Sequence, residues 1–220
     1  MGMCQSAGAT AAKKQPGKNQ PSVGPTPTLV LLRPGSTAAS GEEDPKLDST
    51  GLALAERVGH AMVHEHADFD VVYCSTRRRD VKTTNVVLEA IDRLFLPVEK
   101  EANLVETNTA INEAAGPVWE LDIRPKLKAG LRVLVVAELP TLACLVSKVD
   151  SVPSAVAADL ALEPGAAMVY TFDAATMTVQ QYTEAPKPAG EPHSDATADE
   201  PSEATAPSHP FAARIISAPA

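Results

Sequence analysis

Three of the five histidines fall close together, on a segment whose apolar residues recur at helical spacing. His60 and His64 are four residues apart, so a helix would place both imidazoles on one face, and His66 follows nearby. Paired histidines at this spacing are typical of zinc sites. The alternative is that these side chains face water near a helix end. The sequence favours the second interpretation, and we expect neither a metal nor another cofactor.

The N-terminus matches a lipidation pattern. Gly2 follows the first methionine, and Ser6 stands where the N-myristoylation pattern has Ser or Thr. Cys4 offers a site for palmitate, and three nearby lysines would attract anionic lipid. One acyl chain anchors a protein only marginally, so these further signals matter. Two interpretations stay open for this short pattern: acylation with membrane association, or an unmodified N-terminus.

The overall composition predicts one α/β domain with tails. Of 220 residues, 44% are hydrophobic but only 4% aromatic, so the core must be mainly aliphatic. The formal net charge of −9 leaves no basic surface for a nucleic-acid backbone, and we expect no nucleic-acid partner. Three scattered cysteines are too few for a disulfide framework and favour a reducing, cytoplasmic location. No apolar run reaches the ~20 residues of a membrane-spanning helix.

The chain divides into three compositional zones. Residues 1–27 are a low-complexity segment rich in Ala, Gly, Pro, Ser and Lys, and residues 183–220 form a tail rich in Pro, Ala and Glu. Neither zone has enough apolar side chains to offset the entropy lost on ordering. Residues 28–182 carry the domain. The basic head and acidic tail suggest contacts with different partners, although solvated linkers are the other interpretation.

Extended and helical patterns alternate through the central zone. Apolar runs predict extended segments at 28–32, 69–73, 98–104, 131–137 and 167–172. Helical spacing predicts helices at 49–66, 80–94, 117–128, 142–149 and 154–160. Asp48 is the expected cap of the first helix, and Gly130 suits the left-handed position after the third. The alternation predicts a three-layer α/β sandwich, a mostly parallel sheet covered by helices on both faces.

Several of these segments carry motifs in a recognisable order. Residues 29–35 (Leu-Val-Leu-Leu-Arg-Pro-Gly) are similar to a first-strand motif with the core Arg-His-Gly, and residues 72–83 to the motif S-x-x-x-R-A-x-x-T. The further matches lie at 47–58, 96–106, 119–137 and 164–173. Together they resemble the histidine phosphatase superfamily, most closely cofactor-dependent phosphoglycerate mutase. The resemblance covers about residues 28–175.

The resemblance implies a site, residue by residue. Active members use a histidine nucleophile, arginines that hold phosphate, a second histidine and a glutamate acid/base. Here the arginine before the nucleophile is Arg33 and the second arginine is Arg79, while Glu106 matches the acid/base. The nucleophile position is Pro34, and the second histidine falls at Glu138. The inherited positions are Arg33, Pro34, Gly35, Arg79, Glu106 and Glu138.

The two replacements predict a pseudoenzyme. Pro34 has no lone pair to attack phosphorus, whereas covalent phosphoryl transfer needs an activated nucleophile. Glu138 brings a negative charge to a place where phosphate needs positive charge. We therefore expect Glu138 to pair with Arg33 or Arg79 and to fill the pocket with an internal ion pair.

Two further features bear on activity. Phosphoglycerate mutases carry a long insertion that closes over substrate, and only residues 107–118 stand in its place here. Ser36 and Cys74 are expected beside the site as substitute nucleophiles, but no histidine stands at a matching position to activate either one. We expect Cys74 to be a small buried residue at a strand end.

These expectations lead to a non-catalytic role. We predict a structural or interaction subunit of a larger eukaryotic assembly, with its tails bound to protein partners. Its location would be the cytoplasm, tethered to a membrane or the cytoskeleton, with a flagellum or cilium among the candidates. Two alternatives stay open: a divergent phosphatase using Ser36, Cys74 or a bound water, and a sensor that holds a phospho-ligand through Arg33 and Arg79.

Overall fold

The computed structural model describes residues 26–38, 42–65, 67–106, 109–180 and 214–216. The predicted lipidation residues Gly2 and Cys4 lie outside this part of the chain, as does His66. Among the described residues, no helix is both long enough and apolar enough to cross a bilayer.

A single mixed sheet forms the middle layer of the described chain. Its order is β3-β2-β4-β1-β5-β6, with β7 also paired to β5. The first four strands in this order run parallel, whereas β5 is antiparallel to β1, and β6 and β7 are antiparallel to β5. The strands are β1 (Thr28–Leu32), β2 (Val71–Ser75), β3 (Val98–Glu101), β4 (Arg132–Val136), β5 (Ala167–Phe172), β6 (Val179–Gln180) and β7 (Arg214–Ile216).

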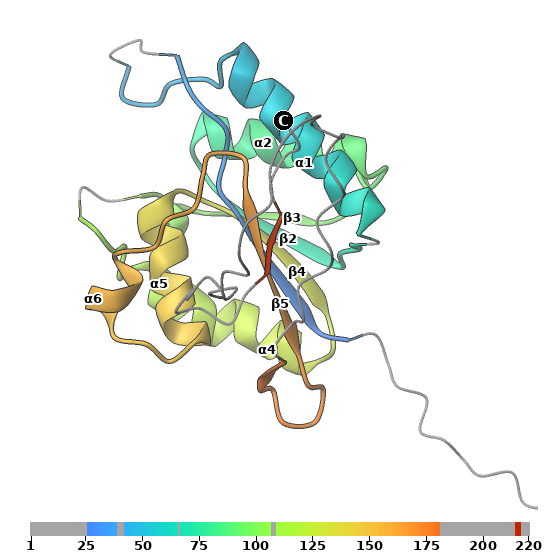
Figure 1. Ribbon diagram of the computed structural model, residues 1–220, viewed down its shortest axis with the longest axis vertical. Helices are drawn as coiled ribbons and strands as arrows, with labels where there is room; N and C mark the ends of the chain where they lie inside the picture. Colours follow the sequence, from blue (N-terminus) through green and yellow to red (C-terminus); the bar gives the residue numbers. More distant parts are fainter. Residues whose placement is uncertain (1–25, 39–41, 66, 107–108, 181–213, 217–220) are drawn as a thin grey trace, which may run out of the picture.

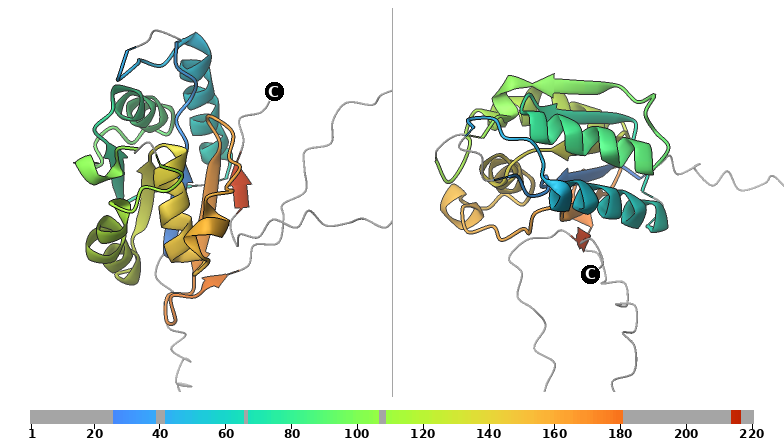
Figure 2. Two further views of the ribbon diagram at one scale, coloured as in Figure 1. Left: turned by 90° about the vertical axis from the view of Figure 1, so that its left-hand side faces the viewer. Right: turned by 90° about the horizontal axis from the view of Figure 1, so that it is seen from above.

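Helices cover both faces of the sheet (Figures 1 and 2). One face carries α1 (Ser49–His64) and α2 (Arg78–Ala90). The opposite face carries α3 (Ala115–Val118), the π-helical turn η2 (Trp119–Ile123), α4 (Arg124–Lys128), α5 (Leu139–Val149) and α6 (Ser154–Ala157). A 3-10 turn, η1 (Ala102–Leu104), follows β3. The predicted three-layer sandwich is confirmed.

Alternating side chains of β1 build two separate cores. Leu29 and Leu31 belong to the core under α4 and α5, while Val30 and Leu32 belong to the core under α1 and α2. All four side chains are fully buried. Because successive residues of a strand point to opposite faces, a continuous apolar run is what a strand covered on both sides requires.

Most predicted elements agree with the structure, with shifted ends. The predicted strand at 69–73 is β2, two residues later, because Cys74 and Ser75 continue the ladder with β3. Helix α2 ends at Ala90 rather than near residue 94, since Asp92 takes a positive φ of 56°. Asp48 caps α1 as expected, accepting a hydrogen bond from the Gly51 amide at 2.6 Å.

The predicted helix at 117–128 is wrong in its pitch. It consists of α3, η2 and α4 in succession, with a π-helical turn at its centre. Pro125 is the second residue of α4, just after that turn, and a proline has no N–H to donate to the regular α-helical ladder. The chain then leaves α4 through Gly130, which has the predicted left-handed conformation with φ of 86°.

Strand β7 comes from the segment that the sequence assigns to the C-terminal tail. Residues 214–216 pair with residues 167–169 of β5, so part of that tail completes the sheet. The predicted strand at 167–172 coincides with β5.

Candidate functional site

The segments that follow β1, β2 and β4 meet where the carboxyl ends of these parallel strands lie side by side. Arg33 follows β1, Arg79 lies in the first turn of α2 after β2, and Glu138 follows β4. Glu106 follows η1, beyond the end of β3. The carboxyl ends of parallel strands share an edge, which is where α/β proteins place their ligands. The structure therefore brings together the four charged residues that the resemblance assigned to a site.

Glu138 lies between two arginines. Its Oε1 is 2.8 Å from Arg79 Nε, and its Oε2 is 3.8 Å from Arg33 Nε. These three side chains are between 15% and 27% exposed, so solvent screens their charges only partly. The ion pair expected from the sequence is present, and it involves both arginines.

Both arginines have further partners. Arg79 Nη2 donates a hydrogen bond to Glu106 Oε1 at 2.5 Å. Arg33 Nη1 donates to the carbonyl oxygen of Leu162 at 2.7 Å. Arg77, which the sequence reasoning missed, places its Nε 3.6 Å from Glu106 Oε1. The run of three arginines at 77–79 was the signal that more than one of them faces the site.

A buried aspartate behind Arg79 was also missed. Asp80 is fully buried; its Oδ2 accepts a hydrogen bond from the Ser75 hydroxyl, and its Oδ1 is 3.8 Å from Arg79 Nε. Burial raises the pKa of Asp80 to about 7, and the charges of Glu138 and Glu106 act in the same direction. The signal was visible in the motif S-x-x-x-R-A-x-x-T, because Asp80 occupies the position of its alanine.

The site is close to electrically neutral. Three arginines (33, 77 and 79) face three carboxylates (80, 106 and 138), so the formal charges cancel when all are ionised. Burial also raises the pKa of Glu138, an effect that Arg79 and Arg33 oppose. The arginines and carboxylates of this site form an internal ion-pair network, and Asp80 can hold a proton. An anion from solution would have to displace a carboxylate of the protein from the arginines.

The loop after β1 is clamped against the start of α1. Pro34 and Gly35 are buried, and a Cβ added to Gly35 would lie 2.5 Å from both the Cα and the carbonyl oxygen of Gly51. Ser36 Oγ donates a hydrogen bond to Asp48 Oδ1 at 2.9 Å, while its carbonyl accepts from the Asp48 amide. The Ser36 hydroxyl is thus held by the residue that caps α1.

The remaining candidates for chemistry lie apart from this network. Cys74 is a free, fully buried cysteine, and burial raises the pKa of its thiol, as expected for a packing residue. His60 is exposed on α1, with its Nε2 4.0 Å from Glu56. Among the described residues no group of three or more His, Cys, Asp or Glu side chains is arranged to hold a metal.

Comparisons with known proteins support the resemblance. Residues 29–119 match the family model described as the histidine phosphatase superfamily (branch 1). The 2,3-bisphosphoglycerate-dependent phosphoglycerate mutase of Zymomonas mobilis is 26% identical over 213 residues, covering 67% of this chain and 93% of the enzyme. The enzyme of the same name from Bifidobacterium longum is 37% identical over 84 residues, covering 36% of this chain and 34% of the enzyme.

Solved structures share the fold. The α-ribazole phosphatase from Shigella flexneri superposes with a TM-score of 0.57 at 19% identity, covering 69% of this chain and 93% of that one. A phosphoglycerate mutase from Bacillus anthracis gives a TM-score of 0.52 at 20% identity, covering 71% of this chain and 92% of that one.

Proposed function

We propose that this chain, which is similar to the phosphoglycerate mutases of the histidine phosphatase superfamily, is catalytically inactive and serves as a structural or interaction subunit. The observation that carries the proposal is Pro34 at the nucleophile position, together with Glu138 between the two arginines that would hold phosphate.

Pro34 removes the nucleophile. Its nitrogen belongs to a tertiary amide, and its ring carries no atom with a free lone pair, so it cannot form a bond to phosphorus. The hydroxyl of the neighbouring Ser36 donates a hydrogen bond to Asp48, whose carboxylate also accepts a hydrogen bond from the Gly51 amide as the cap of α1. Ser36 is therefore held in a structural contact. Cys74 is fully buried with a raised thiol pKa, which disfavours the reactive thiolate.

Glu138 removes the attraction for the substrate. An incoming phosphate would first have to break the charge-assisted contacts of Arg79 with Glu138 and Glu106 before it could make contacts of its own. Two like charges about 4 Å apart repel by about 4 kcal/mol at an effective dielectric constant near 20. The wild-type pocket is therefore expected to bind phosphate weakly.

The length of the chain agrees with a reduced lid. The alignment with the Zymomonas enzyme spans 213 residues but takes in only 67% of this chain, so that enzyme has sequence between matched segments that this chain lacks. Residues 107–118 stand in place of the lid, and their last four residues form α3. Without a longer lid, water exclusion from a reacting phosphate would be poor.

A hydrolysis assay tests the inactive state. The purified protein is incubated with an aryl phosphate, with Arg79→Ala as the matched variant. We expect both proteins to release phosphate at the background rate. Hydrolysis by the wild type that Arg79→Ala abolishes would show that the site is catalytic and would overturn the proposal.

The size of the native particle tests the subunit role. We expect the protein, isolated gently from the cells that make it, to run in a complex larger than a dimer and to co-purify with defined protein partners. A free monomer or a plain dimer would remove the main support for this part of the proposal. The assembly would be eukaryotic, cytoskeletal or membrane-associated.

The N-terminal pattern adds membrane tethering to the proposal. Gly2 and Cys4 are the residues that acyl chains would modify, and the lysines that follow would contact anionic lipid. Incorporation of a labelled myristate into the full chain, and its loss in Gly2→Ala, tests the first step. A wild-type chain that takes up no label would rule it out.

The retained arginines favour one second candidate, a phospho-ligand sensor. Arg33, Arg77 and Arg79 converge on one place, and the pKa of the neighbouring Asp80 is near neutrality. A thermal-shift titration with 3-phosphoglycerate distinguishes the two roles. Stabilisation that disappears in Arg79→Ala would favour the sensor, whereas no stabilisation would favour the purely structural role.

A further inference from the structure

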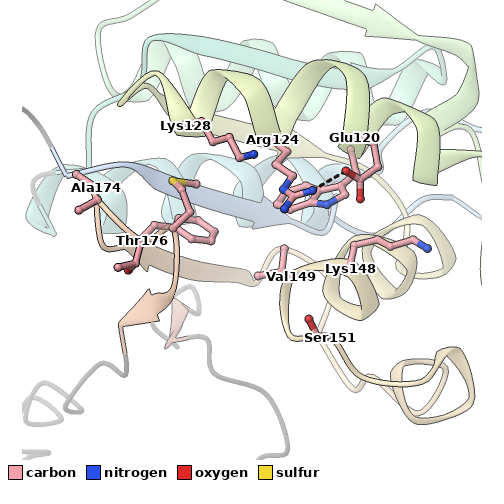
Figure 3. A pocket seen from close by; sticks show the side chains of 12 residues that line it. Glu120, Arg124, Lys128, Lys148, Val149, Ser151, Ala174 and Thr176 are labelled. Atoms are coloured by element: carbon pink, nitrogen blue, oxygen red, sulfur yellow. Dashed lines mark hydrogen bonds and ion pairs between the residues drawn. The ribbon is translucent and has the colours of Figure 1, made fainter.

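A cavity lies at the opposite end of the parallel strands from the arginine–carboxylate site. Its volume is about 600 Å3, and it lies between α4, the end of α5 and the turn after β5 (Figure 3). Helix α5 starts directly after Glu138 and ends at Val149, one of the residues that line the cavity. Eleven helical residues span about 16 Å, so the two sites are separate.

Apolar and aromatic side chains form part of the cavity floor. Trp119, Val149, Phe172 and Met177 contribute to its lining, and Trp119 and Phe172 are otherwise buried in the core beneath α4 and α5. Trp119 and Phe172 are only 5% and 3% exposed, so no more than the edges of their rings reach the cavity. Aromatic edges in a concave site are common in pockets that bind small organic molecules.

Cations surround this floor. Arg124 and Lys128 come from α4, and Lys148 comes from the last turn of α5. Glu120 pairs with Arg124 at 2.9 Å, as the dashed line in Figure 3 shows. Lys128 and Lys148 take part in no ion pair with the described residues, and they leave the lining with a surplus of positive charge.

That surplus contrasts with the rest of the molecule. The whole chain carries a formal net charge of −9, so a concave site with two lysines that no described acid pairs stands out. Two acids flank the lining. Asp150 Oδ2 accepts a hydrogen bond from the Tyr170 hydroxyl at 2.8 Å, and Asp173 Oδ1 accepts from the amides of Ala175 and Thr176 at 2.9 and 2.8 Å. Both carboxylates are thus engaged within the fold, and neither residue lines the cavity.

We propose that this cavity binds a small aromatic compound that carries phosphate groups. The ring would lie against Trp119 and Phe172, and the phosphate oxygens would contact Lys128 and Lys148. A ring alone would leave the lysines without a counter-charge, and phosphate alone would leave the apolar floor exposed. Affinity should therefore depend on both parts in one molecule.

Trp119 offers a direct readout. It is the one tryptophan in the sequence and it lines the cavity, so its fluorescence reports occupancy of this site. The probes are ADP, which has both parts, adenosine, which has the ring, and pyrophosphate, which has the charge. At low salt we expect ADP to change the emission saturably and to bind at least ~10-fold more tightly than either fragment, a difference of about 1.4 kcal/mol.

Two pairs of variants locate the binding. The double variant Lys128→Gln/Lys148→Gln should weaken ADP binding at least ~10-fold, consistent with the loss of two charged contacts. Lys82→Gln/Lys100→Gln removes the same charge from two exposed lysines that do not share a cavity and should leave binding unchanged. Arg79→Ala should also leave it unchanged, because the other site is not involved. Circular dichroism confirms that each variant is folded.

Three outcomes would overturn the proposal. They are no saturable change with ADP, pyrophosphate binding as tightly as ADP, and equal loss in the two lysine double variants. The first would mean that the cavity does not take this class of ligand. The other two would reduce the interaction to general attraction between an anion and surface lysines.

Discussion

The carboxylate of Glu138 lies between the guanidinium groups of Arg33 and Arg79, where a bound anion would have to lie. Its Oε1 lies 2.8 Å from Arg79 and its Oε2 lies 3.8 Å from Arg33, while Glu106 contacts a second nitrogen of Arg79. In the proposed function, a side chain of the protein thus occupies the place of a ligand. Because this carboxylate is covalently part of the chain, it is present at a high effective concentration and a free anion competes poorly with it.

Removing the charge of Glu138 should open the pocket to anions. In Glu138→Gln, Arg33 and Arg79 lose their shared carboxylate but keep a side chain of the same shape. We expect inorganic phosphate to bind at least ~10-fold more tightly than to the wild type, as measured by isothermal titration calorimetry. Glu89→Gln removes the same charge from an exposed position on α2 and should not change binding. Equal affinities in all three proteins would show that Glu138 does not block the site.

Asp80 makes the stability of the protein depend on pH. Its pKa is about 7 in the folded state and 3.8 for the ordinary side chain, so the folded protein keeps a proton that the unfolded chain has released. Between about pH 4 and pH 7 the free energy of unfolding should therefore fall as the pH rises. A shift of this size corresponds to at most about 4 kcal/mol.

Asp80→Asn tests this linkage. The amide keeps the acceptor for the Ser75 hydroxyl and cannot ionise, so the variant should match the wild type near pH 4 and exceed its stability by about 1–3 kcal/mol at pH 8. Urea unfolding across this pH range measures the difference. Asp159→Asn changes an exposed aspartate and should run parallel to the wild type. A stability difference that does not vary with pH would contradict the assigned pKa.

Only part of this residue network followed from the sequence. Arg33, Arg79 and Glu138 occupy motif positions, and opposite charges at one sheet edge are expected to pair. Asp80 and Arg77 were missed because amphipathic spacing does not reveal which polar residue of a first helical turn faces inward. Burial of Asp80 depends on Ser75, five residues earlier on β2, and that contact exists only after the strand and α2 have packed.

Among the elements, the contact between the loop after β1 and the first turn of α1 depends on two glycines. A Cβ on Gly51 would lie 2.1 Å from the carbonyl oxygen of Ser36 and 3.0 Å from its amide nitrogen. Backbone atoms cannot move aside as a flexible side chain can. The position of Arg33 and Pro34 relative to α1 is therefore fixed by this close approach.

Gly51→Ala should separate the loop from the helix. The clash should cost about 1–3 kcal/mol in the free energy of unfolding, more than the ~1 kcal/mol that alanine contributes to helix propensity. Gly116→Ala is the matched control in α3, where the nearest atom to the new Cβ is Lys148 Cε at 3.7 Å. That variant should be neutral or slightly more stable. If urea unfolding showed the two variants to be equally stable, the proposed close packing would be wrong.

At the same scale, continuous apolar runs were predicted better than helix pitch. Strands β1 and β5 have the bounds expected from their aliphatic residues. A strand that is buried on both faces is apolar along its whole length, so the apolar run itself marks where the strand begins and ends. The π-helical turn at Trp119–Ile123 was not predicted, since a single i→i+5 turn within a helix is too short to show in the spacing of the apolar residues. The caps were predicted where one residue type dominates, at Asp48 and Gly130.

For the whole molecule, the two edges of the sheet are protected in different ways. Strand β3 is short and carries Glu99, Lys100 and Glu101, and charges of this kind discourage pairing with another chain. The opposite edge of β5 is covered by β6 at one end and β7 at the other. Strand β7 returns to the sheet from a segment that composition assigns to a tail, which sequence periodicity over three residues could not reveal.

Removing β7 should therefore uncover residues 167–169 of β5 as an open edge. We compare a chain that ends at Ile216, which keeps β7, with one that ends at Ala213, which lacks it. The shorter chain should lose about 1–3 kcal/mol in the free energy of unfolding, because it gives up ladder hydrogen bonds. It should also associate as its concentration rises, because a bare apolar strand edge pairs with other chains. Sedimentation velocity and urea unfolding measure the two effects, and identical behaviour of both chains would show that β7 contributes nothing to the closed sheet.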